Sequence, residues 1–193
     1  MEKKKIWLTF DDGPRQTQTD TVLDTLARSD IKATFFIVGS LVAKHGERIR
    51  RILGEGHRIG NHTYDHLRLV GQDKDTIIDQ IKRTEQALAP FQAPDPIMRP
   101  PYGAHDALVD RTIADLGYRQ VLWSVDTQDW KSDYREGGWV AHGIEQIRKR
   151  NHSIVLMHDI HATTANNLGR FIEQIQALGD VSFESPATLA PLK

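Results

Sequence analysis

Short runs of β-branched and aromatic residues alternate along this chain with longer segments in which apolar residues recur every three or four positions. The first pattern is typical of strands and the second of amphipathic helices. Strands and helices that alternate in this way build a mostly parallel sheet covered by helices. We therefore expect an α/β fold.

Seven short segments are predicted to be strands. They are Ile6–Phe10, Ala33–Val38, His57–Gly60, Ile97–Arg99, Arg119–Trp123, Ile154–Met157 and Val181–Phe183. Seven strand and helix units in 193 residues fall short of the roughly 250 residues that a regular eight-stranded barrel occupies. We therefore predict a distorted or incomplete (β/α) barrel with about seven mostly parallel strands.

Helical periodicity is clearest in three segments, around residues 22–26, 49–53 and 77–88. Asp73 is a suitable N-cap for the third helix, and Pro90 would end it. The chain contains no low-complexity stretch that would separate two cores. Residues 1–193 are therefore expected to form a single domain.

Composition and charge exclude several classes of function. The formal net charge is −1 with dispersed basic residues, so the electrostatic footprint of a nucleic-acid-binding protein is missing. No apolar run approaches the roughly 20 residues that span a bilayer, and the start MEKKKIWLTF does not resemble a signal peptide. We expect no nucleic-acid partner and no membrane span, and we take the monomer as the default oligomeric state.

The residues able to do chemistry follow the predicted strands. They are Asp11 and Asp12, His62, Arg99, Asp126 and Asp129, and His158. The carboxyl ends of parallel strands meet at one edge of the sheet, so these side chains should share one cleft. The chain has no cysteine, and any metal ion would therefore be held by histidines and carboxylates.

Two segments suggest a metal centre. In GNHTYDH, His62 and His66 are four residues apart, a spacing that would put both imidazoles on one face if the segment is helical. The alternative is that both are ordinary surface or core histidines without a metal. In LTFDDGP, Asp11 and Asp12 end a strand and point in different directions, so that one carboxylate could bind a metal while the other faces water. Two solvated acids at a turn are the alternative.

Three further segments carry polar groups at strand ends. In MRPPYG, Arg99 could orient a carboxylate, and the prolines would hold Tyr102 in place. WSVDTQDW contains two acids and two tryptophans, and IVLMHDIH ends an apolar strand with His158. Taken singly, each of these segments could be core packing with polar ends.

Taken together and in this order, TFDDGP, HTYDH, RPPY, DTQDW and LMH resemble the five signature motifs of the polysaccharide deacetylases. This is the carbohydrate esterase group built on the NodB homology domain. The resemblance extends from Thr9 to His158, which is most of the chain. It implies a metal-dependent hydrolase that removes acetyl groups from a carbohydrate.

The resemblance also implies a role for each matching residue. Asp12, His62 and His66 correspond to the metal ligands. Asp11 corresponds to the catalytic base, oriented by Arg99, and His158 to the general acid, tuned by Asp129. The Tyr102 backbone amide would stabilise the oxyanion, and Trp130 and Leu156 would form the pocket for the acetyl methyl group. The role of Asp126 stays open. His105 and His161 lie next to the third and fifth motifs and could line the cleft.

The resemblance leaves the substrate open. The expected reaction is N-deacetylation of N-acetylglucosamine units in chitin-type oligosaccharides or peptidoglycan. Alternatives are O-deacetylation of xylan, hydrolysis of another amide such as a cyclic imide, or an inactive carbohydrate-binding domain. The expected cofactor is a divalent metal, zinc by preference, with cobalt or nickel as alternatives. The family also implies a secreted or cell-surface protein.

Overall fold

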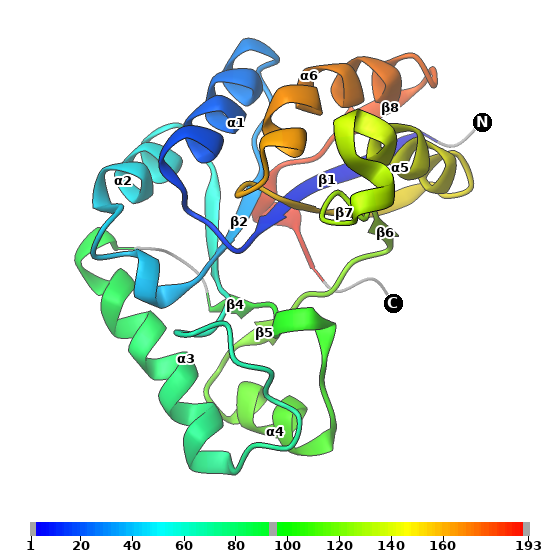
Figure 1. Ribbon diagram of the computed structural model, residues 1–193. Coiled ribbons are helices and arrows are strands. Elements are labelled where there is room, and N and C mark those ends of the chain that lie inside the picture. Colours follow the sequence, from blue (N-terminus) through cyan, green and yellow to red (C-terminus); the bar gives the residue numbers. More distant parts are fainter. Residues whose placement is uncertain (1–2, 93–95, 191–193) are drawn as a thin grey trace.

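A single parallel sheet forms the centre of the molecule (Figure 1). The computed structural model describes residues 3–92 and 96–190. Within them the strands are β1 (Lys4–Asp11), β2 (Thr34–Ile37), β3 (Arg58–Asn61), β4 (Ile97–Met98), β5 (Arg119–Gln120), β6 (Val125–Asp126), β7 (His152–His158) and β8 (Val181–Phe183). They are arranged as β5-β4-β3-β2-β1-β7-β6, and β8 pairs with the beginning of β1.

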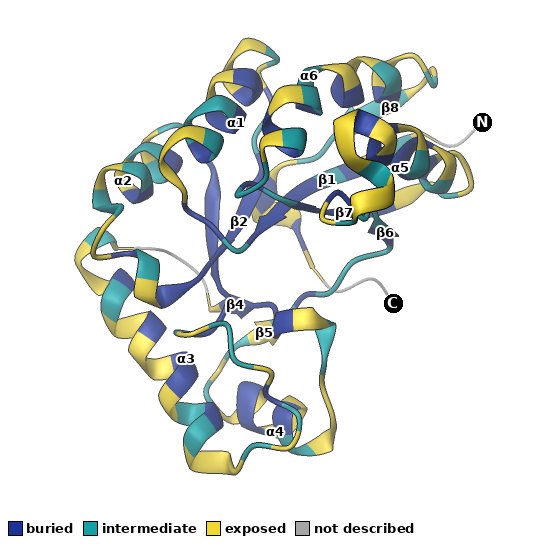
Figure 2. Cartoon of the chain, viewed as in Figure 1, coloured by how far each residue is buried: buried dark blue, intermediate teal, exposed yellow. Residues whose placement is uncertain are grey.

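Six α-helices in the described chain surround the curved sheet (Figure 1). They are α1 (Gln16–Arg28), α2 (Gly46–Gly54), α3 (Lys74–Leu88), α4 (Ala107–Asp115), α5 (Gly138–Arg148) and α6 (Ala162–Gln176). Figure 2 shows that the central strands β2 and β3 are buried, whereas the edge strand β5 is partly exposed and the helices are exposed on their outer faces. None of these helices is long and apolar enough to cross a membrane.

The three helices predicted from periodicity are confirmed as α1, α2 and α3. The Asp73 side chain accepts a hydrogen bond from the Thr76 N–H and so caps α3 as expected. The α-helix ends at Leu88, two residues before Pro90, which lies in a single 3-10 turn, η2 (Ala89–Phe91). Local signals were sufficient to predict both ends of this helix.

The prediction of an incomplete (β/α) barrel is confirmed, because β5 and β6 are the two unjoined ends of the sheet. The predicted strand Arg119–Trp123 is shorter, and β6, which was not predicted, follows it. Val121 N–H donates to Met98 on β4, whereas Ser124 N–H donates to Ile154 on β7. The chain therefore leaves one edge of the sheet and joins the other within a few residues.

Both faces of the sheet are buried, as is usual for parallel strands. On β2, Phe35 and Ile37 belong to the main core between the sheet and its helices. Phe36 points the other way, into a smaller cluster inside the curl of the sheet with Ile97 and Val121. Apolar side chains fill the inside of the curl, and polar groups gather where the strands end.

Gly60 lies where β3 packs most tightly. A Cβ atom at this position would lie 2.5 Å from Cδ1 of Phe36 and 3.2 Å from Cγ1 of Ile97. Both neighbours are fully buried. Only a glycine fits between them without displacing the inner cluster.

We predict that Gly60→Ala destabilises the protein by about 1–3 kcal/mol, because the added methyl group overpacks a dense core. The free energy of unfolding in urea measures the effect. The matched control is Gly169→Ala in α6, where the nearest atom to a new Cβ is 3.8 Å away. If both substitutions leave the unfolding midpoint unchanged, the close packing described around Gly60 is contradicted.

Candidate active site

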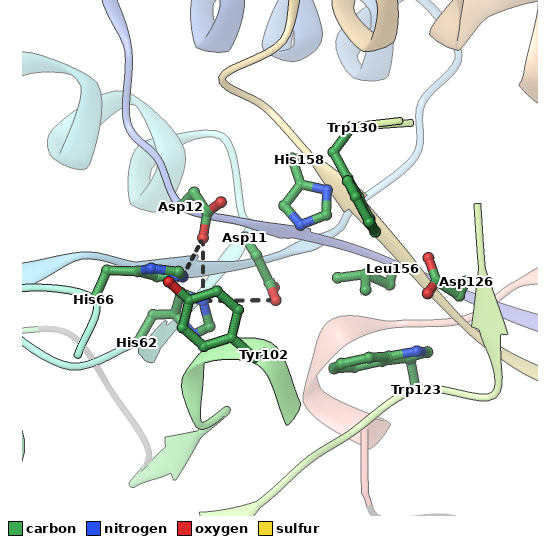
Figure 3. Close-up of a pocket in the computed structure, with 10 residues that line it drawn as sticks. All are labelled: Asp11, Asp12, His62, His66, Tyr102, Trp123, Asp126, Trp130, Leu156 and His158. Atoms are coloured by element: carbon green, nitrogen blue, oxygen red, sulfur yellow. Dashed lines mark ion pairs between the residues drawn. The ribbon is translucent and has the colours of Figure 1, made fainter. Parts of the chain in front are cut away.

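A pocket of about 430 Å³ lies at the carboxyl ends of the strands (Figure 3). Its lining contains Asp11, Asp12, His62, His66, Tyr102, Trp123, Asp126, Trp130, Leu156 and His158. All the predicted site residues are among them except Arg99 and Asp129, which are buried behind the lining. In Figure 3, Asp12, His62 and His66 occupy one end of the pocket, and Leu156, Trp123 and Asp126 the other.

Asp12, His62 and His66 converge on one point. The Asp12 Oδ1 atom lies 3.2 Å from Nε2 of His62 and 3.1 Å from Nε2 of His66. One ligand atom from each residue lies within 4.8 Å of the other two. Burial raises the pKa of Asp12, but the two neighbouring imidazoles outweigh it and hold the pKa well below its usual range. The carboxylate is therefore ionised.

The hydrogen bonding of the His62 ring indicates which kind of group these three residues can bind. Its Nδ1 lies 2.7 Å from the Arg99 carbonyl oxygen, which can only accept, so Nδ1 is the donor. In a neutral ring, Nε2 then turns its lone pair toward Asp12 Oδ1, a buried atom with no well-formed hydrogen bond in the described structure. Two acceptors that face each other are satisfied by a shared cation, and two imidazoles and a carboxylate are typical zinc ligands.

The segment from His62 to His66 is a loop, so the condition that it be helical is not met. Thr63 and His66 both have left-handed backbone conformations, with φ of 64° and 56°. These two residues reverse the chain so that both imidazoles face Asp12. The two imidazoles therefore meet through loop geometry, and their spacing of four is not evidence of a helix.

Asp11 and Arg99 form a buried ion pair at the centre of the site. Asp11 is the last residue of β1, and Arg99 follows β4. Arg99 Nη1 lies 2.7 Å from Asp11 Oδ1, and its side chain is fully buried. The other Asp11 oxygen, Oδ2, lies 3.8 Å from Nε2 of His62. One carboxylate oxygen is thus fixed by Arg99 while the second is directed toward the His62 imidazole.

His158 is held on the opposite side of Asp11 by a single carboxylate. Asp11 and His158 are direct neighbours in the register of β1 and β7. Asp129 Oδ1 lies 2.7 Å from His158 Nδ1, and Asp129 Oδ2 accepts hydrogen bonds from the His158 backbone N–H and the Thr164 hydroxyl. These hydrogen bonds occupy Nδ1 of His158, so Nε2 is the ring nitrogen available to the pocket.

The environment of His158 raises its pKa. Burial alone lowers it, but the hydrogen bond and charge of Asp129, with the charges of Asp11 and Asp12, raise the pKa from 6.5 to about 9. With this pKa, the His158 ring carries a positive charge at neutral pH.

Apolar and aromatic side chains line much of the rest of the pocket. Leu156 is buried on β7, whereas Trp130 and Tyr102 are about half or more exposed, at 52% and 65%. Tyr102 has a left-handed backbone, and its ring lies 4.8 Å from that of His66. Trp123 also lines the pocket, although the motifs gave it no role. The only available signal was its position in the segment WSVDTQDW, three residues before Asp126.

The residues without an assigned role differ in their positions. Asp126 lines the pocket, and its Oδ1 accepts a hydrogen bond from the Gln128 N–H. His105 lies outside the lining and pairs with Asp110, 2.9 Å from Nδ1 to Oδ1. His161 is also outside the lining, with its ring 5.7 Å from that of His158.

We predict that His158 in the metal-free protein titrates near pH 9 by NMR and that Asp129→Asn shifts its pKa down toward 6.5 or below. Because the pKa of His158 is higher in the folded protein than the unfolded value of 6.5, its protonation stabilises the fold. This contribution to the free energy of unfolding is complete below pH 6.5 and is lost as the pH rises through about 9. Thermal unfolding should show this loss in the wild type but not in Asp129→Asn. His158→Gln identifies the signal, and a wild-type titration near pH 6.5 would contradict the prediction.

Comparisons with known proteins agree with this arrangement. A family model described as polysaccharide deacetylase matches residues 1–121. A peptidoglycan-N-acetylglucosamine deacetylase of Listeria monocytogenes is 42% identical over 178 residues, which are 91% of this chain but 37% of that protein. A chitooligosaccharide deacetylase of Rhizobium leguminosarum bv. trifolii is 36% identical over 167 residues, 82% of this chain and 73% of that protein.

A solved structure extends the similarity to the whole fold. It is a family 4 carbohydrate esterase from Streptomyces lividans in complex with acetate, with a TM-score of 0.84 and 27% identity over 99% of this chain and 100% of that chain. Against the Listeria protein, by contrast, the chain spans little more than a third of the relative's length. Since the family model matches more than half of the sequence and both relatives align with most of it, the chain belongs to the polysaccharide deacetylase family.

Proposed function

We propose that this chain is a metal-dependent deacetylase that hydrolyses the N-acetyl groups of N-acetylglucosamine units in peptidoglycan or chitin-type oligosaccharides. The names of the relatives support this substrate class. The observation that carries the proposal is one pocket in which Asp12, His62 and His66 lie beside the Asp11 carboxylate and a cationic His158. A peptidoglycan substrate would require the protein at the cell surface or secreted.

Asp12, His62 and His66 would hold the divalent metal, for which we propose zinc, with cobalt and nickel as alternatives. When bound, a divalent ion supplies Lewis acidity, which lowers the pKa of water and polarises a carbonyl oxygen. The His62 Nδ1–H bond to the Arg99 carbonyl fixes the ring so that Nε2 remains the ligand atom.

Asp11 is proposed as the base. Arg99 holds Oδ1, so Oδ2 is the oxygen free to accept a proton from the attacking water. The water oxygen adds to the acetyl carbonyl carbon, and the negative charge develops on the carbonyl oxygen. We propose that the Tyr102 backbone amide donates to this oxygen, because Tyr102 lines the pocket beside His66.

His158 is proposed as the acid. Its Nε2 donates a proton to the sugar nitrogen as the carbon–nitrogen bond breaks, which releases acetate and a free amine. Asp129 keeps the ring charged and oriented, and Arg99 performs the same positioning role for Asp11. Leu156 and Trp130 would receive the acetyl methyl group, since they supply apolar surface at the far end of the pocket.

We predict that metal removal abolishes acetate release and that zinc restores it. Acetate release is measured with N-acetylglucosamine oligomers, peptidoglycan and acetylated xylan in parallel, before and after chelation. The two N-acetylated substrates should be deacetylated and xylan should not. Activity in the chelated protein would contradict the metal requirement, and preferential release from xylan would reassign the substrate.

We predict that Asp11→Asn lowers kcat by about 10²- to 10⁴-fold, because the amide cannot accept the proton. Zinc affinity should change little, since Asp11 is not a proposed ligand. The control is Asp115→Asn, which removes a distant exposed carboxylate that pairs only with Lys74 among the described residues. Wild-type turnover by Asp11→Asn would remove Asp11 from the role of base.

A further inference from the structure

Helix α3 contributes no residue to the pocket, yet one of its side chains holds the loop that carries His62 and His66. Gln80 is buried, and its Oε1 accepts hydrogen bonds from the N–H groups of Tyr64 and Asp65, at 3.0 and 2.9 Å. Its Nε2 donates to Asp65 Oδ2 at 3.0 Å. One amide thus makes three hydrogen bonds to the two residues in the middle of the loop.

The Tyr64 and Asp65 N–H groups find their hydrogen-bond acceptor on α3 and not within the loop itself. Left-handed residues at Thr63 and His66 turn the backbone out of any regular ladder, and backbone N–H groups without partners are costly to bury. Gln80 is long enough to reach them from the helix. The orientation of its amide follows from chemistry, since backbone N–H groups can be bonded only by the oxygen.

Two neighbouring contacts indicate that the loop is seated on α3 as a unit. Thr84, one turn after Gln80, packs against Gly39. A Cβ atom added at Gly39 would lie 2.6 Å from the hydroxyl oxygen of Thr84. Gly39 N–H in turn donates to the carbonyl oxygen of Thr63. Arg83 stacks on the Tyr64 ring and approaches Asp65 at 3.4 Å, but it is exposed and contributes little. Gln80 is the buried anchor.

We infer that Gln80 is a positioning residue for the metal centre: it fixes the loop so that both imidazoles face Asp12. This inference rests on the proposed metal site. It assigns to α3 a role in metal affinity, although Gln80 lies outside the five motifs of the sequence. Removal of a polar group that orients metal ligands without binding the metal itself typically weakens metal affinity by about 10- to 100-fold.

The test compares Gln80→Leu, which keeps the size of the side chain but removes its hydrogen bonds, with Gln86→Leu at an exposed position of the same helix. Zinc affinity of the metal-free proteins is measured by competition with a chromophoric chelator, at a temperature where circular dichroism shows each protein folded. Gln80→Leu should bind zinc about 10- to 100-fold more weakly, and Gln86→Leu should match the wild type.

A compensating pair tests the hydrogen bonds themselves. Gln80→Glu keeps an acceptor for the two N–H groups but places a carboxylate against that of Asp65. Adding Asp65→Asn supplies an amide donor to that carboxylate and restores the net charge. The double variant should therefore regain most of the zinc affinity that Gln80→Leu loses.

The outcomes separate three explanations. Gln80→Leu with a lower thermal midpoint but wild-type zinc affinity would show a merely structural role and overturn the inference. Failure of the double variant to bind zinc more tightly than Gln80→Leu would also contradict it. A wild-type protein that binds no zinc would contradict the proposed metal centre itself, and with it the inference.

Discussion

The buried guanidinium of Arg99 is the interaction on which the rest of this site depends. A charge removed from water must be paired and hydrogen-bonded, and Arg99 meets this requirement with groups from separate parts of the sheet. It donates to Thr9 and Asp11 on β1 and to the carbonyl oxygens of Val121 and Leu122. Its guanidinium also lies over the ring of Phe36, 4.2 Å from the centroid.

These partners relate the site to the incomplete barrel. Val121 and Leu122 lie where the chain crosses between the two unpaired edges of the sheet, so their carbonyl oxygens do not belong to a continuous ladder. Arg99 supplies their donors and holds Asp11 with the same side chain. One side chain therefore serves both the break in the ladder and the proposed base, and loss of Arg99 would remove donors from the buried Asp11 carboxylate and from two carbonyl oxygens.

The site combines rigid and loop-borne groups. Asp11 and His158 are adjacent strand ends whose spacing is set by the ladder between β1 and β7. Asp12 leaves the strand at a φ of 74°, and His62 and His66 lie on an irregular loop. The sheet therefore sets the positions of the proposed proton-transfer residues. The loop that carries the two proposed histidine ligands is instead held by hydrogen bonds to Arg99 and Gln80.

Local pattern determined much of this protein. Hydrophobic periodicity predicted the α/β class and the helices α1, α2 and α3. The polar residues after each strand predicted which side chains would gather, because parallel strands all end at one edge. The strand predicted at Arg119–Trp123 is shorter, because the ladder breaks there between two edges of the sheet. At His62–His66 a spacing of four, which would suit a helix, belongs to a loop. The places of Trp123 and Gln80 were decided only by the tertiary structure, since each depends on contacts between segments distant in sequence, which no local pattern of residues encodes.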